Sequence, residues 1–204
     1  MATDEQQDVN GAAGWLPPSA EAIARALAEA GRGRPPVHLW NPDFCGRIDM
    51  RIARDGTWFH EGSPIGRPEL VRLFASILRR EGDRYFLVTP VEKMEIEVED
   101  VPFLAVDFER EGEGEDQQLI FLTNVGDAVI AGPAHPIRVT TDPASGAPAP
   151  YLLVRDGLEA RIDRKSFYRL VEIGERMPVG GEEWFGVRSE GTFFPFIRAA
   201  DLAG

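Results

Sequence analysis

The chain contains a duplicated segment. The five residues Ile52–Gly56 return as Leu153–Gly157, so that Arg54 and Asp55 have counterparts 101 positions later in the chain. Each copy is followed by a short strand pattern, an arginine, an amphipathic helix pattern and an aromatic-led strand pattern. A duplicated unit predicts two related lobes with a seam between them, and such seams are common sites for ligands.

Length, charge and cysteine content narrow the class of protein. A chain of 204 residues can bury a sizeable core, either as one large domain or as two small ones. The net charge of −12 argues against general binding to nucleic-acid backbone and against docking on anionic membranes, while leaving room for a local basic pocket. The single cysteine, the acidic N-terminus without a signal-peptide pattern and the lack of a membrane-length apolar stretch predict a cytoplasmic protein.

Local patterns predict hairpins and helices. Residues 48–52 alternate apolar and charged, Asp55-Gly56 predicts a tight turn, and residues 57–60 predict the return strand. One helix begins at Pro68, and the alanine-rich segment 20–30 predicts another. The helix at Pro68 carries apolar residues at 70, 73, 74, 77 and 78 with Arg79-Arg80 at its end, and a third helix follows the capping residue Asp163. Further strands are predicted over 85–88, 94–98, 103–108, 119–123, 127–131, 137–141, 152–154, 158–162, 183–187 and 192–194.

These elements predict the domain organisation. Residues 1–36 form a tail and helix, residues 37–90 form a first repeat unit that continues into a β-rich middle to about 142, and residues 143–204 form a second repeat unit. The segment Asp142–Pro148 is rich in turn formers and is the predicted linker. Strands outnumber helices and the turns favour hairpins, so the predicted fold class is α+β, with two repeated lobes of curled antiparallel sheet that each carry a packed helix.

Several polar groups have two interpretations that the sequence leaves open. Asp49 and Arg51 share one strand face, either as an exposed pair or as the lining of a pocket. Arg67 and Arg161 flank the repeated helices, where they either bind a phosphate or pair with nearby carboxylates. Cys45 has no histidine signature beside it, which favours an inert thiol over a nucleophile. No metal-ligand spacing or cofactor motif is present, so we expect no metal and no cofactor, and we assign no catalytic residue.

Several motifs resemble a family of uncharacterised bacterial proteins of about this length. The resemblance covers nearly the whole chain after Pro36. It implies a duplicated α+β core whose C-terminal half is superficially like a pleckstrin-homology (PH) domain, and a ligand site at the lobe interface for a nucleotide-like molecule in signalling. The matching runs include Trp40-Asn41-Pro42-x-Phe44-Cys45-Gly46, Leu87-Val88-Thr89-Pro90-Val91-Glu92-Lys93, Thr123-Asn124 and Arg155-x-Gly157-Leu158-Glu159-Ala160.

The resemblance leads to a functional prediction. We expect a cytoplasmic binding or sensor module whose small anionic ligand, of which a nucleotide is one candidate, is held between the lobes by arginines and Lys93, with a signalling protein as its partner. Two alternatives stay open: an enzyme that uses Asp49 or Cys45, and a protein-interaction scaffold that uses the PH-like lobe. The sequence names neither the ligand nor the oligomeric state. The matched polar residues, which are the candidate ligand-binding residues, are Asn41, Asp49, Arg51, Arg67, Thr89, Lys93, Thr123, Asn124 and Arg161.

Overall fold

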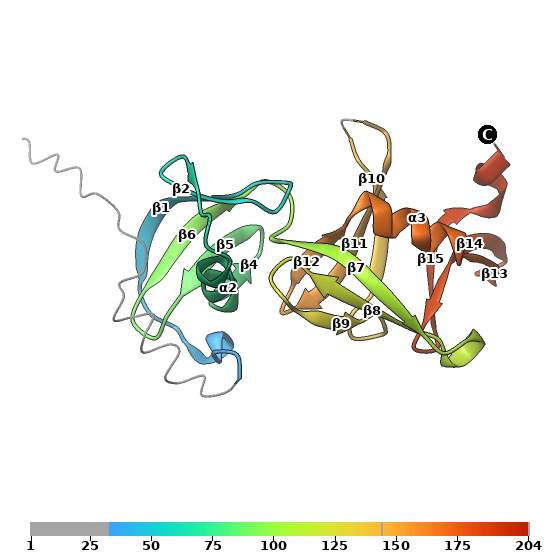
Figure 1. Ribbon diagram of the computed structural model, residues 1–204, viewed down its shortest axis with the longest axis horizontal. Coiled ribbons are helices and arrows are strands. Elements are labelled where there is room, and N and C mark those ends of the chain that lie inside the picture. The colour runs from blue at the N-terminus through green and yellow to red at the C-terminus, as the bar shows by residue number, and fades with distance from the viewer. Residues whose placement is uncertain (1–32, 144, 204) are drawn as a thin grey trace, which may run out of the picture.

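The computed structural model of the chain describes residues 33–143 and 145–203. Two lobes lie side by side along the long axis of the molecule, and the chain crosses between them where β6 (Lys93–Val98) passes into β7 (Phe103–Glu111) (Figure 1). The helix predicted over 20–30 lies outside the described residues. A duplicated α+β core with a seam is therefore the architecture of this protein.

The N-terminal lobe is a six-stranded sheet in the order β3-β2-β1-β6-β5-β4. The hairpin predicted at Asp55-Gly56 is confirmed, because β1 pairs antiparallel with β2 across this turn. The sheet also contains one parallel pair, since the chain passes through β2, β3, a helix, β4 and β5 before β6 returns beside β1. The remaining bounds are η1 Val37–Leu39, β1 Phe44–Ile52, β2 Trp58–His60, β3 Ser63–Pro64, β4 Leu78–Glu81 and β5 Arg84–Val88.

Helix α2 (Pro68–Ser76) packs on the N-terminal sheet through the apolar side of its predicted pattern. Phe74 stacks on Trp58 of β2, with ring centroids 6.3 Å apart, and both side chains are buried. Burial of two aromatic side chains in one contact contributes several kcal/mol by order of magnitude. Pro68 occupies the first turn, as predicted.

The same helix ends earlier than its apolar spacing predicted. The carbonyl of Ile77 accepts from Val88 N at 2.9 Å, and Leu78 pairs with Leu87, so these two apolar residues turn out of the helix into a strand. Arg79 and Arg80 therefore lie in β4 and not at a helix end. Strand pairing with β5 buries Ile77 and Leu78 as fully as a further helical turn would have done, and local periodicity does not distinguish the two outcomes.

The C-terminal lobe is built on a second six-stranded sheet, in the order β10-β11-β12-β7-β8-β9. The predicted linker Asp142–Pro148 is a hairpin loop inside this sheet, because Thr141 of β10 pairs with Pro148 of β11. The sheets divide between Val98 and Phe103, whereas the predicted repeat units, which follow the sequence duplication, divide at 142–143. Again one pair is parallel, β7 with β12. The bounds are β8 Gln118–Thr123, β9 Ala128–Ile130, β10 Ile137–Thr141, β11 Pro148–Arg155, β12 Leu158–Ile162 and η2 Gly114–Asp116.

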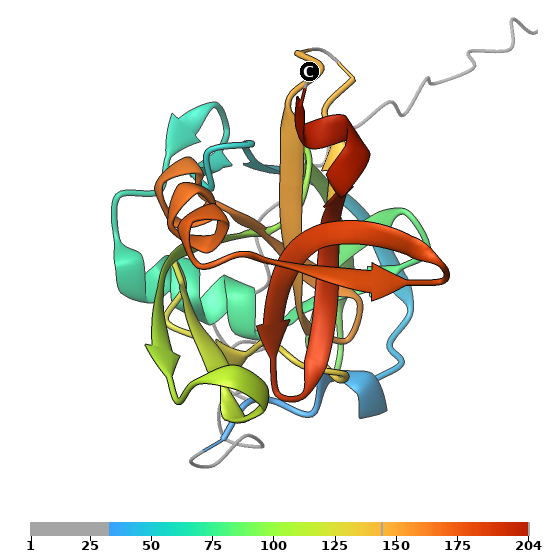
Figure 2. The same ribbon diagram turned by 90° about the vertical axis from the view of Figure 1, so that its right-hand side faces the viewer.

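A helix and a small third sheet complete this lobe. Helix α3 (Arg164–Glu172) begins after Asp163, whose Oδ1 accepts from Ser166 N at 2.7 Å, so the predicted cap is confirmed. The predicted closing hairpin is formed by β14 (Glu182–Ser189) and β15 (Thr192–Arg198), joined by the unpredicted β13 (Glu175–Val179). Figure 2 shows this small sheet at the end of the molecule, followed by η3 (Ala199–Ala203). The C-terminal lobe thus consists of a helix and a small sheet on a larger curved sheet, while its likeness to a PH domain stays a prediction.

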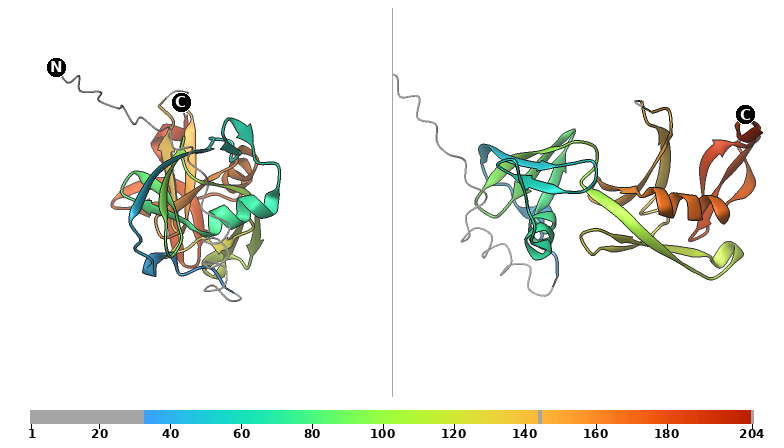
Figure 3. Two further views of the ribbon diagram at one scale, coloured as in Figure 1. Left: turned by 90° about the vertical axis from the view of Figure 1, so that its left-hand side faces the viewer. Right: turned by 45° about the horizontal axis from the view of Figure 1, so that its top comes forward.

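The two lobes share one buried apolar cluster, which runs from the N-terminal sheet through the second sheet to the small sheet. Figure 3 shows the two lobes next to each other with the chain passing between them, so the residues where they meet decide how the lobes are held together. Among the described residues, no helix has the length and apolar character needed to cross a membrane.

Candidate functional site

The chain segment that links the lobes carries two carboxylates. Glu99 is contacted by the guanidinium of Arg51, and its Oε2 accepts from the backbone N–H of Arg54 at 2.9 Å. Asp100 faces the second lobe, where it accepts from Arg161 Nη1 at 2.9 Å and from the hydroxyl of Tyr151 at 3.1 Å. Each lobe is therefore tied to the linking segment by at least one guanidinium–carboxylate contact, which is stronger than a neutral hydrogen bond.

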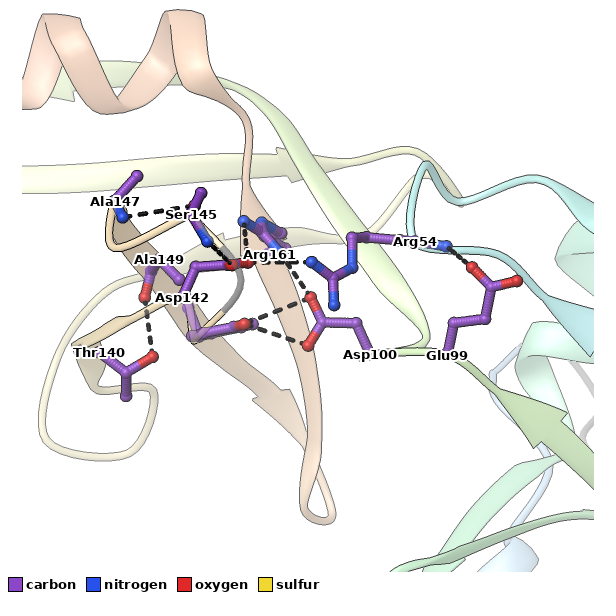
Figure 4. Close-up of polar contacts among 10 residues, drawn as sticks. Arg54, Glu99, Asp100, Thr140, Asp142, Ser145, Ala147, Ala149 and Arg161 are labelled. Atoms are coloured by element: carbon purple, nitrogen blue, oxygen red, sulfur yellow. Dashed lines mark hydrogen bonds and ion pairs between the residues drawn. The ribbon is translucent and has the colours of Figure 1, made fainter.

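A third carboxylate closes the network from the other side. Asp142, whose side chain is only 7% exposed, accepts from Arg54 Nη1 at 2.9 Å and lies 3.6 Å from Arg161 Nη2. Its other oxygen accepts from Ser145 N at 3.0 Å, which fixes the β10–β11 loop. In Figure 4 Arg161 lies between Asp100 and Asp142, and Arg54 reaches toward the latter from the N-terminal lobe. We call Arg54, Asp100, Asp142, Tyr151 and Arg161 the junction network.

Burial and charge act against each other in the junction network. Burial lowers the pKa of Arg161, but the hydrogen bond that Arg161 donates to Asp100 and the negative field of the surrounding oxygens outweigh it and raise that pKa above its usual value. Burial also raises the pKa of Tyr151, and the Asp100 carboxylate adds to this effect. Arg161 is thus a permanent cation and Tyr151 a neutral donor at neutral pH.

The opposite side of the seam is held by the second copy of the hairpin. Arg155 is 12% exposed, donates to the carbonyl of Ala75 near the end of α2 at 2.9 Å, and is paired with Asp127. Asp127 in turn accepts from Arg34 at 2.6 Å. A cavity of about 280 Å³ opens here, lined in part by Arg34, His38 and Arg155. Because Asp127 contacts both guanidiniums, this cavity offers little uncompensated positive charge.

A different cavity adjoins the junction network on the C-terminal lobe. It has a volume of about 310 Å³ and is lined by Arg161, Arg164, Phe167, Tyr168 and the loop before β11. Arg164 donates from Nε and Nη2 to the Tyr168 hydroxyl at 3.0 and 2.8 Å, and among the described residues it forms no ion pair. None of the described residues that line the cavity is a carboxylate. We call this cavity the arginine pocket.

Comparison with known proteins agrees with this two-lobed description. Two family models match the chain, one on each side of the junction. The DUF1285 N-terminal domain matches residues 35–101, and the DUF1285 C-terminal domain matches residues 102–196. Both are domains of unknown function. The chain belongs to the DUF1285 family. The division between the two DUF1285 domains coincides with the segment that carries Glu99 and Asp100.

Two solved DUF1285 structures resemble the chain. A DUF1285 family protein from Silicibacter pomeroyi is 57% identical, with a TM-score of 0.81 over 90% of this chain and 98% of that one. Another from Shewanella baltica is 31% identical, with a TM-score of 0.49 over 61% of this chain and 91% of that one. A comparison with curated proteins found no match. Membership of the DUF1285 family assigns no activity to the chain, since both of its domains are of unknown function.

Of the nine predicted DUF1285 site residues, four lie at or near the junction. Arg51 contacts Glu99, and Arg161 belongs to the junction network. Asn124 Oδ1 accepts from Leu104 N at 3.0 Å. Asn124 Nδ2 lies only 2.8 Å from the position that a Cβ atom on Gly56 would occupy. Thr123, which precedes Asn124, is buried and accepts from Asp127 N at 2.9 Å.

The other five lie elsewhere on the N-terminal lobe. Parallel pairing with Phe44 places Lys93 at the end of the sheet opposite the junction, where it contacts Glu81 at 3.4 Å, and Asn41 lies in the loop just before Phe44. Because a strand rises about 3.3 Å per residue, Lys93 lies roughly 20 Å along β6 from the junction. Thr89 is buried in the neighbouring turn. Asp49, in the middle of β1, and Arg67, which precedes α2, are exposed.

The residues associated with enzyme chemistry are scattered as well. Cys45 is half-buried, and its thiol donates to the carbonyl of Asp43 at 3.4 Å. Within the described ranges 33–143 and 145–203, no group of three His, Cys, Asp or Glu side chains is arranged to hold a metal ion. Asp49 lines a cavity of about 260 Å³ together with Arg47 and Glu97, which lie 3.6 Å from each other.

Sequence reasoning missed the partners that define the junction. Asp100, Asp127 and Asp142 were not singled out as site residues, although each lies next to a turn or at the end of a strand. One signal was available, because Arg54 and Arg155 occupy the same position in the two copies of the hairpin. Both reach across the seam, so the repeated arginine was the better guide to the interface.

Proposed function

We propose that this protein is a binding or sensor module for a small anionic ligand, and that the arginine pocket binds it. The observation that carries the proposal is Arg164, which forms no ion pair among the described residues and lies beside Arg161 in one cavity whose described lining includes no carboxylate. On a chain with a net charge of −12, local positive charge has to overcome the repulsion that the whole molecule exerts on an anion. Forked guanidiniums suit phosphate and carboxylate groups.

The position of Arg161 connects ligand binding with the arrangement of the lobes. Arg161 contacts Asp100 and Asp142, and Asp142 also binds Arg54 of the other lobe. An anion on Arg161 competes with these two carboxylates for the same guanidinium. Binding therefore alters the contacts that hold the lobes together, which is the differential interaction that a signalling role requires.

A nucleotide-like ligand is one form of this proposal. The rings of Phe167 and Tyr168 line the same cavity as the two arginines, so a phosphate on the guanidiniums would place an attached ring system near aromatic faces. A signalling protein as partner is the corresponding proposal for the output of the module.

The proposal is tested by thermal shift against inorganic phosphate, a panel of nucleotides and a panel of phosphorylated metabolites. A ligand at 100 times its dissociation constant adds about 2.7 kcal/mol to the free energy of unfolding. Arg164→Gln should abolish most of the shift, whereas the matched Arg176→Gln, at an exposed arginine of the small sheet, should leave it unchanged. Binding should also weaken at high salt.

Two outcomes contradict the proposal. The first is no shift with any member of the panel. The second is a shift that Arg164→Gln and Arg176→Gln reduce equally, because binding would then lie outside the arginine pocket.

A further inference from the structure

A second cavity continues from the arginine pocket along α3 toward the C-terminal end of the helix. It has a volume of about 360 Å³ and lies between β10, α3 and β15. The two cavities share Pro148 and Phe167 as lining residues, so they meet at these side chains. We call the second cavity the apolar groove; its apolar lining includes Val139, Phe167, Val171, Phe185, Phe196 and Leu202.

The apolar groove has few groups that could form hydrogen bonds with a ligand. Its polar side chains are those of Thr140 and Thr141, and the hydroxyl of Thr140 donates to the carbonyl of Ala149 at 3.4 Å. A nucleobase placed here would leave most of its donors and acceptors without partners, which is unfavourable in a dry site. An alkyl chain needs no partners and gains from leaving water.

Helix α3 connects the two cavities by its own periodicity. Arg164, Phe167, Tyr168 and Val171 are spaced at i, i+3, i+4 and i+7, so they follow one face of the helix from its charged first turn to its apolar end. At about 1.5 Å per residue this stripe is roughly 10 Å long. Val171 remains 39% exposed, so the apolar end of the stripe is open to a ligand.

We infer that the ligand is a free amphiphile, with an anionic head group on Arg161 and Arg164 and an alkyl tail in the apolar groove. This inference rests on the proposed function and adds the chemical class of the ligand. The charged and the apolar part of such a molecule correspond to two adjoining cavities of different polarity, joined at Phe167. The same head group is found on membrane lipids, but the net charge of −12 opposes approach to an anionic membrane surface.

The test is calorimetric titration of the whole protein with inorganic phosphate, butyl phosphate and octyl phosphate, each below the concentration at which it aggregates. We expect each added methylene to tighten binding about two- to fourfold, so that octyl phosphate binds at least tenfold more tightly than butyl phosphate. Arg164→Gln should weaken all three ligands, with Arg176→Gln as its control.

A pair of exposed valines tests the tail. Val171 in the apolar groove and Val179 in β13 are 39% and 40% exposed, so replacing either with Glu should not disturb folding. Val171→Glu should remove the advantage of octyl over butyl phosphate, whereas Val179→Glu should preserve it. Both variants add the same charge to the protein, so a general electrostatic effect would appear in both.

The outcomes separate the two proposals. If phosphate binds in a manner that depends on Arg164 but octyl phosphate binds no more tightly, the proposed function stands and the amphiphile inference is wrong. If none of the three ligands binds, neither holds for this ligand chemistry. If Val171→Glu and Val179→Glu behave alike, the tail does not occupy the groove.

A separate experiment tests whether the ligand is a membrane lipid. If the protein sediments with anionic phospholipid vesicles and Val171→Glu abolishes this sedimentation, the ligand is a membrane lipid and not a free amphiphile.

Discussion

The two copies of the repeated hairpin use the same arginine in different surroundings. Arg54 is 52% exposed and contacts Asp142 in the other lobe at 2.9 Å. Arg155 is 12% exposed and donates to Ala75 in the other lobe while pairing with Asp127. Both arginines reach across the seam to the other lobe, so the duplication has preserved this kind of contact. The difference in burial changes how much free energy of unfolding is lost when the contact is removed. A contact of the same type contributes far more in a buried setting, chiefly because its loss leaves an uncompensated charge.

The glycines of the two turns differ in the same way. Gly56 and Gly157 both have a positive φ, +80° and +75°. A Cβ at Gly56 would lie 2.8 Å from Asn124 Nδ2 and 3.0 Å from Leu104 Cδ1, whereas at Gly157 the nearest atom is 3.9 Å away. Gly56 is pressed against side chains of the other lobe, whereas Gly157 has room for a Cβ even though its carbonyl accepts from Arg80 Nη1 of the other lobe at 3.1 Å. Equal sequence therefore does not mean equal packing, and substitutions at matched positions measure the difference.

The largest effect is expected at the buried arginine. Arg155→Ala should lower the free energy of unfolding by about 3 kcal/mol, because it removes a buried charged donor from the carboxylate of Asp127 and from the carbonyl of Ala75. The contact of Arg34 with Asp127 keeps the loss from being greater. Urea denaturation measures this value, and a loss below about 1 kcal/mol would show that Arg155 does not hold the seam.

The matched turn glycines should give the next largest effect. Gly157→Ala should cost about 1 kcal/mol because alanine adopts a positive φ poorly. Gly56→Ala should cost at least about 1 kcal/mol more, because its Cβ also collides with the second lobe. Thermal or urea unfolding of both variants gives the difference, and equal losses would contradict the tight lobe contact at Gly56.

The two helices provide a smaller comparison. Asp163 caps α3 through Ser166 N, whereas no side chain among the described residues caps α2 after Arg67. Asp163→Ala should therefore destabilise the protein by about 1 kcal/mol, and Arg67→Ser should stabilise it by about 0.5 kcal/mol. Unfolding curves at constant ionic strength test both, with opposite signs as the diagnostic result. A loss on Arg67→Ser would mean that the arginine itself contributes to stability.

The smallest effect is expected at the exposed arginine of the first hairpin. Arg54→Ala should lower the free energy of unfolding by no more than about 1 kcal/mol, because the buried Asp142 keeps its contact with Arg161, and the loss should shrink in high salt, since the exposed guanidinium is screened. The same denaturation experiment at two salt concentrations measures it. If Arg54→Ala were as harmful as Arg155→Ala, the contrast between the two copies would be lost.

The sequence predicted much of the local structure. The hairpin at Asp55-Gly56, the cap at Asp163 and the closing hairpin around Glu190-Gly191 depend on residues within a few positions of one another, and all three are present. The end of α2 was misplaced because Ile77 and Leu78 satisfy a helical period and a buried strand equally well. The linker prediction at Asp142–Pro148 was wrong because turn formers serve a hairpin loop as well as a domain boundary.

The candidate site was predicted only in part. Arg161 belongs to both the junction network and the arginine pocket, and Arg51 and Asn124 lie at the junction. Lys93 lies at the end of the N-terminal sheet that is opposite the junction, and its position in the sequence motif did not reveal this distance. Arg164 was not selected because a cation in the first turn of a helix has no special signature until the cavity beside it is seen.

The amino-acid sequence alone showed the duplication, because the two copies can be compared directly. It also determined the turns, the helix cap and the α+β class, because these follow from interactions between residues close together in the chain. Only the tertiary structure decided which charges meet. Arg161 and Asp100 are 61 residues apart, and Arg54 and Asp142 are 88 apart. Whether a guanidinium ends beside a carboxylate or in an open cavity depends on how two sheets curl and pack, and no local pattern records that geometry.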